Sequence, residues 1–78
     1  MEKLLSNIKN GEHVIVRELK NSVFKVKMME MGLIKGKKIE VLFRAPFGGP
    51  IAIDVDGYTL SLRKDEAALV LIDIQNDV

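Results

Sequence analysis

The fold is decided by the stretch IAIDVDGYTLSL, residues 51–62. At its centre, Asp56-Gly57 is a strong hairpin signal, because a two-residue type I′ turn needs two residues that tolerate positive φ. With these residues in the turn, the flanking strands oppose Val55 to Tyr58, Ile53 to Leu60 and Ile51 to Leu62. Directly opposed residues share one face of a sheet, and all six are apolar. Turn chemistry and hydrophobic pattern therefore predict the same hairpin in the same register.

Three further strands are predicted around this hairpin. Residues 12–19 (EHVIVREL) follow a glycine and are rich in β-branched side chains. Residues 37–45 alternate apolar and polar side chains, which predicts a strand with one inward face, formed by Ile39, Val41, Phe43 and Ala45. Residues 68–74 (ALVLIDI) predict a last strand, and residues 63–67 (RKDEA) predict a single helical turn before it.

Residues 21–31 (NSVFKVKMMEM) predict a short helix between the first two strands. Phe24, Met28 and Met31 fall on one helical face, at i, i+4 and i+7. The helix should end in a Schellman motif, with Gly32 left-handed and Leu33 in contact with Met28. We therefore expect a mostly β fold: a small five-stranded barrel, closed or half-closed, with one short α-helix capping one end.

Composition limits the possible classes of protein. The 78 residues fit one domain, 1–78, and a hydrophobic content of 47% is sufficient for a compact core. Cysteine is absent, which removes disulfides and thiolate metal sites and suits a reducing cytoplasm. The N-terminus has no secretory h-region, and the longest apolar run, residues 67–72, is too short to cross a bilayer. We expect a cytoplasmic protein without direct membrane insertion.

The chain offers no constellation typical of an enzyme. His13 is the only histidine and has no partner at metal-ligand spacing, so we expect no metal site. Asp54 and Asp56 could form an acid/base pair, but their place on the polar side of a strand favours a solvated face. No glycine-rich phosphate loop and no serine nucleophile elbow occur. We expect no catalytic residue and no cofactor.

Surplus apolar residues favour a binding protein. Leu42 interrupts the polar face of its strand, and Leu69 and Leu71 make the last strand apolar on both faces. These side chains either form an exposed interface patch or are covered by the helix or by the N-terminal segment that carries Leu4, Leu5 and Ile8. Met29 points away from the buried helical face, and its thioether could adapt to a partner.

The loop APFGGPI, residues 45–51, contains both prolines of the chain. Pro46 and Pro50 limit strand pairing to either side, and Gly48 and Gly49 permit the positive φ of a sharp reversal. Phe47 either folds under the loop as a lid on the barrel or projects as an anchor for a partner. Because a proline-rich loop holds a fixed shape, we favour the lid.

The order of these segments resembles the FeoA family. The resemblance runs from about residue 5 to residue 74 and rests on LSNIKNGE (5–12), MMEMGL (28–33), GKKIEV (36–41), APFGGPI (45–51), VDGY (55–58) and LRKDEA (62–67). It implies an SH3-like barrel and a cytoplasmic accessory protein of bacterial ferrous iron uptake. The implied partner is FeoB, a membrane transporter with a cytoplasmic GTP-binding domain, which would hold the protein peripheral to the inner membrane. The chain departs from the family pattern at Asn10, Lys35 and Gly49.

On this basis we expect a non-enzymatic regulatory protein that contacts FeoB, with a possible homo-oligomer. The candidate partner-binding residues are Met29, Leu42, Phe47, Gly48, Gly49, Leu69 and Leu71. Two alternatives stay open. One is a small nucleic-acid-binding barrel that uses Lys35, Lys37 and Lys38, although a net charge of +1 disfavours it. The other is an FeoA-like module that contacts an iron-dependent regulator.

Overall fold

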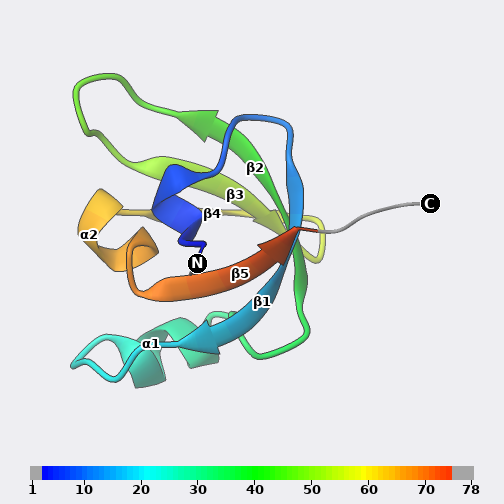
Figure 1. Cartoon of the computed structure of the whole chain (residues 1–78), viewed down its shortest axis with the longest axis vertical. Helices are drawn as coiled ribbons and strands as arrows, with labels where there is room; N and C mark the ends of the chain where they lie inside the picture. The colour runs from blue at the N-terminus through cyan, green and yellow to red at the C-terminus, as the bar shows by residue number, and fades with distance from the viewer. Residues whose placement is uncertain (1–2, 75–78) are drawn as a thin grey trace.

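Five antiparallel strands form one strongly curled sheet (Figure 1). The structure is a computed structural model that describes residues 3–74. Its elements are η1 (Leu5–Asn7), β1 (His13–Leu19), α1 (Lys25–Glu30), β2 (Lys38–Arg44), β3 (Ile51–Val55), β4 (Tyr58–Leu62), α2 (Lys64–Ala67) and β5 (Val70–Ile74). The strand order is β4-β3-β2-β1-β5, so within this sheet the edge strands β4 and β5 do not pair with each other. The predicted mostly β, five-stranded barrel is confirmed in its half-closed form.

The β3–β4 hairpin has the predicted turn and register. Asp56 and Gly57 have φ of 52° and 88°, the left-handed values that a type I′ turn requires. The strands pair Val55 with Tyr58, Ile53 with Leu60 and Ile51 with Leu62. A charge-assisted hydrogen bond of 2.6 Å from Lys37 Nζ to Asp56 Oδ2 ties this turn to the start of β2.

A β-bulge in β2 overturns the predicted alternation of that strand. Val41 pairs with Ile53, but Phe43 pairs with Ala52, so the register shifts at Leu42. Phe43, expected inside, is therefore on the outer face and 56% exposed. Arg44 shares the inner face with its partner Ile51, and its guanidinium donates a hydrogen bond to the carbonyl oxygen of Ile8.

Helix α1 is shorter than predicted at its start and ends as predicted. The backbone N–H of Phe24 donates to Ser22 Oγ at 3.1 Å, a local turn that occupies the residues expected in the first helical turn. At the other end Gly32 has φ of 98°, and its N–H and that of Leu33 donate to the carbonyls of Met29 and Met28, each at 3.0 Å. This pattern is the Schellman motif. Of the predicted buried stripe, Met28 is buried, whereas Phe24 is exposed.

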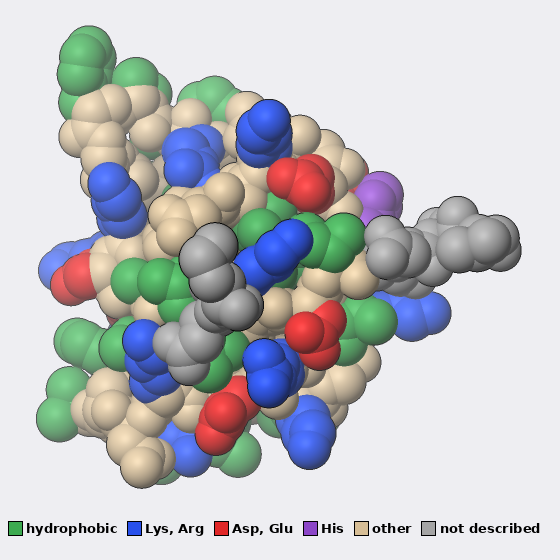
Figure 2. All heavy atoms as spheres, in the orientation of Figure 1, with side chains coloured by type: hydrophobic (Ala, Val, Ile, Leu, Met, Phe, Trp, Pro, Cys, Tyr) green, Lys and Arg blue, Asp and Glu red, His purple; other side chains and the backbone are tan. Residues whose placement is uncertain are grey.

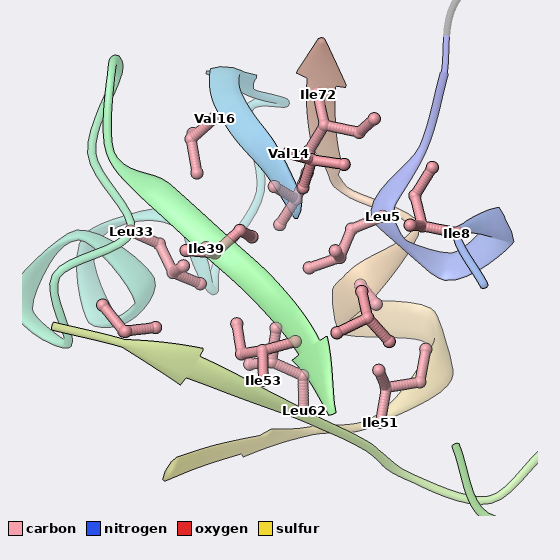
Figure 3. Close-up of a cluster of buried hydrophobic side chains, with 14 of the residues drawn as sticks. Leu5, Ile8, Val14, Val16, Leu33, Ile39, Ile51, Ile53, Leu62 and Ile72 are labelled. Atoms are coloured by element: carbon pink, nitrogen blue, oxygen red, sulfur yellow. The ribbon is translucent and has the colours of Figure 1, made fainter. Parts of the chain in front are cut away.

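The core lies inside the curl of the sheet (Figure 3). Leu5 and Ile8, from the segment before β1, point into it beside Val14 and Ile72. The same segment pairs with β5, through a bridge between Leu4 and Leu71 and a 3.0 Å hydrogen bond from Ile72 N–H to Lys3 O.

This N-terminal pairing resolves the open question about the last strand. Leu71 is only 5% exposed, and Leu69 is half-buried against the core. The interpretation of Leu71 as part of an exposed patch is therefore wrong, because the segment carrying Leu4 covers it. For Leu69, which stays partly accessible just before β5, partner binding remains a prediction. Within residues 3–74, no helix has both the length and the apolar content that a membrane span requires.

Candidate partner-binding surfaces

The loop between β2 and β3 projects from the barrel, and hydrophobic side chains lie at this end of the molecule (Figures 1 and 2). Phe47 has a relative exposure of 104%, the highest among the large hydrophobic residues. The interpretation of Phe47 as a lid is therefore wrong. Its φ of 58° and that of Gly48, 72°, make the reversal and turn the ring outward. We call Leu42, Phe43, Phe47, Gly48 and Gly49 the hairpin tip.

The loop requires glycine at position 49 because of close packing, not because of the positive φ that the sequence predicted. Its φ is not positive; instead, a Cβ at this position would lie 2.7 Å from Ala45 Cβ and 3.2 Å from the carbonyl oxygen of Pro46. The two ends of the loop are also joined by a 2.9 Å hydrogen bond from Ala45 N–H to Pro50 O. Close backbone packing thus fixes the loop that presents Phe47.

A pocket of about 280 Å³ lies beside the base of the hairpin tip. Its walls combine the loop with Ser6 of η1, Arg44 of β2 and Lys64 of α2. A side chain added at Gly48 would meet Lys64 Cδ at 3.9 Å, so the α2 lysine lies directly against the loop. The tip therefore offers an exposed aromatic residue with a cationic pocket behind it.

A second apolar surface surrounds α1 and was largely missed from the sequence. Val23 is 90% exposed, Val26 is 66% exposed, and Met29 and Ile34 are each nearly half exposed. We call these four residues the helix surface. The sequence did contain an indication of this surface. Val23, Val26 and Met29 are spaced three residues apart, which on a helix places them near one another on the side opposite Met28. Met29 and Ile34 also line a groove of about 570 Å³ with Leu19 and Leu33.

The predicted partner-binding residues thus divide between two places. Leu42, Phe47, Gly48 and Gly49 belong to the hairpin tip, whereas Met29 belongs to the helix surface. The β2–β3 loop and α1 lie toward opposite ends of the molecule in Figure 1. The structure does not bring these residues together into one patch.

Asp54 and Asp56, considered in the sequence as an acid/base pair, have different neighbours in the structure. Asp56 is bonded to Lys37, and Asp54 lies opposite Glu40 in the sheet. His13 Nε2 lies 3.5 Å from Glu40 Oε1, an exposed cross-strand pair. Within the described residues, no group of three histidine, cysteine or acidic side chains is placed to hold a metal ion.

The barrel exposes an aromatic loop and an apolar helix surface, and exposed apolar patches of this kind are typical of protein-interaction sites. The FeoA domain family matches residues 3–74, nearly the whole chain. The protein therefore belongs to the FeoA domain family, as the motifs in the sequence indicated.

Known relatives agree with this assignment. The chain is 35% identical over 71 residues to the Fe(2+) transport protein A/Fe(2+) transporter FeoB fusion protein of Porphyromonas gingivalis. That match covers 90% of this chain but only 8% of the fusion protein. An NMR structure of an FeoA-like protein from Clostridium acetobutylicum is 32% identical with a TM-score of 0.87, and the match covers 99% of this chain and 91% of that one.

A third comparison supports the SH3-like fold. The zinc complex of FeoA from Stenotrophomonas maltophilia, described as a prokaryotic SH3 domain protein, has a TM-score of 0.81 at 24% identity. The match covers 91% of this chain and 89% of that chain. The barrel is therefore SH3-like, as the family resemblance implied.

Proposed function

We propose that this protein is a non-enzymatic cytoplasmic accessory protein of bacterial ferrous iron uptake that regulates FeoB by direct contact. The observation that carries the proposal is the Porphyromonas gingivalis relative, in which Fe(2+) transport protein A and FeoB are one fusion protein. Fusion holds two modules at a high effective concentration, which is useful when the two modules act on each other.

The hairpin tip is the surface that we assign to FeoB. The ring of Phe47 is fully exposed, and the loop that carries it is fixed by the close packing of Gly49 against Ala45. Aromatic anchors are enriched at the centres of protein interfaces, and a fixed loop loses little conformational entropy on binding. Lys64 and Arg44, beside the base of the tip, would favour a partner surface with acidic groups around an apolar pocket.

The test is a binding titration of the purified protein against the FeoB of the same organism in detergent, with and without guanine nucleotide. Saturable binding that Phe47→Asp weakens at least tenfold is the expected result. The matched control is Met29→Asp, which places the same charge on the helix surface and should leave binding unchanged. Equal binding by the native protein and Phe47→Asp would remove the hairpin tip from the interface. Absence of binding in both nucleotide states would reject FeoB as the direct partner.

A further inference from the structure

The basic residues are concentrated in one part of the chain. Residues 17–38 contain seven of the twelve basic residues but only two of the eleven acidic ones, a net charge of +5. The remaining residues have five basic and nine acidic side chains, a net charge of −4. The basic residues of the segment are Arg17, Lys20, Lys25, Lys27, Lys35, Lys37 and Lys38. The net charge of +1 for the whole chain thus conceals a strong asymmetry.

The fold places this charge around the helix surface. Residues 17–38 comprise the end of β1, all of α1 and the turn that leads into β2. Arg17, Lys25 and Lys35 line one groove with Met29 and Ile34 of the helix surface. The carboxylates of Glu18 and Asp73 line the same groove, so its basic residues outnumber its acidic ones by three to two. Among the described residues, Arg17, Lys27 and Lys35 form no ion pair with a carboxylate. Figure 2 shows basic side chains beside hydrophobic ones at this end of the molecule.

The kinds of side chain on this surface distinguish between possible partners. Protein interfaces are depleted in lysine and enriched in arginine, tyrosine and tryptophan. Here six of the seven basic residues are lysines, and the segment contains no tyrosine or tryptophan. Single-stranded nucleic acid is bound on aromatic stacking platforms, but Phe24 is the only aromatic residue among residues 17–38. Both classes of partner are therefore disfavoured.

An anionic lipid surface suits the same side chains. Val23 and Val26 project as exposed aliphatic groups, which can enter the boundary between headgroups and acyl chains. The flexible stems of the lysines can follow apolar surface while their ammonium groups stay at the headgroups. Anionic lipids attract clustered lysines, and this attraction is additive over the charges near the membrane.

We propose that the helix surface and the lysines around it dock this protein directly on an anionic membrane. Val23 and Val26 would lie at the level of the headgroups, with Lys25, Lys27 and Lys35 against lipid phosphates. Because the β2–β3 loop lies toward the other end of the molecule, docking leaves the hairpin tip free to contact a protein (Figure 1). Membrane association would then arise from the protein itself as well as from its partner.

The test is co-sedimentation of the protein alone with vesicles of phosphatidylcholine, with and without phosphatidylglycerol as one third of the lipid. Binding is expected only with phosphatidylglycerol, and high salt should abolish it because the Debye length shortens. Each lysine near the membrane surface changes the partition coefficient of the protein between vesicles and water about fivefold. The triple variant Lys25→Gln/Lys27→Gln/Lys35→Gln should therefore lower this coefficient about 100-fold. Val23→Ser/Val26→Ser should also weaken binding, and both side chains are exposed, so the fold should be preserved.

The matched control is Lys3→Gln/Lys9→Gln/Lys64→Gln, which makes the same change in net charge outside residues 17–38. This control should bind nearly as well as the native protein. Equal loss in the two triple variants would overturn the proposal, because binding would then follow net charge alone. Retention on single-stranded RNA without vesicle binding would overturn it in favour of nucleic acid. FeoB is absent from this assay, so its outcome is independent of the proposed function.

Discussion

Replacing Phe47 with asparagine should stabilise the protein and weaken its binding to FeoB. A left-handed backbone costs a residue other than glycine roughly 1–2 kcal/mol, and asparagine is among the residues that tolerate it best. The ring of Phe47 is fully exposed, so its removal loses no buried apolar area. We expect the free energy of unfolding to rise by about 0.5–1 kcal/mol, since asparagine relieves part of the strain.

Urea denaturation followed by circular dichroism measures this change. The urea concentration at the midpoint of unfolding should rise, while the dependence of the unfolding free energy on urea stays unchanged. The melting temperature should rise by about 2–8 °C for a domain of this size. Phe47→Ala is the matched control: it removes the ring but keeps a Cβ in the left-handed conformation, so its stability should stay within about 0.5 kcal/mol of the native value. The same Phe47→Asn protein should bind FeoB roughly 30-fold more weakly if Phe47 is an interface hot spot.

Two outcomes would refute this reasoning. A loss of more than about 0.5 kcal/mol in Phe47→Asn would mean that the ring makes stabilising contacts, as the lid interpretation required. An equal gain in Phe47→Asn and Phe47→Ala would mean that backbone strain is not the cause. If stability rises and FeoB binding is unchanged, the strain at Phe47 is confirmed but its role as the anchor is wrong.

Four further substitutions, one of them a control, test the packing with the same urea assay. Gly49→Ala should lose about 1–3 kcal/mol, because its Cβ would lie 2.7 Å from that of Ala45; unchanged stability would mean that the loop yields easily. Met28→Ala should lose about 2–5 kcal/mol from the core, whereas Met29→Ala, on the exposed side of the same helix, should change stability by less than about 0.5 kcal/mol. Gly32→Ala should lose about 1–3 kcal/mol, because φ there is 98°, and a neutral result would contradict the need for a glycine at the end of α1.

The sequence predicted those parts of the fold that depend on local backbone chemistry. Asp56-Gly57 and Gly32 require positive φ, so the hairpin register and the end of α1 followed from neighbouring residues alone. The bulge at Leu42 did not, because an alternating pattern carries no mark of an extra residue. The burial of Leu71 also depended on a distant segment, since its cover is Leu4.

The candidate surfaces were predicted in part. The outward orientation of Phe47 was one of the two considered but not the favoured one. It depends on a backbone conformation that phenylalanine rarely adopts, which the sequence does not indicate. The exposure of Val23 and Val26 was not predicted, because a helical stripe of apolar residues indicates only the face that packs on the core. The net charge of +1 for the whole chain does not reveal the basic segment from residue 17 to residue 38.

The pairing of the N-terminal segment with β5 has a consequence for solubility. The outer edge of β5 carries backbone groups that could pair with another chain, and Val70, Leu71 and Ile72 make this strand strongly apolar. Exposed edges of this kind are templates for aggregation. The N-terminal segment covers part of this edge, because Ile72 N–H donates a hydrogen bond to Lys3 O and Leu4 forms a β-bridge with Leu71. Residues 3–8 therefore occupy part of an edge on which another chain could otherwise pair, in addition to completing the core.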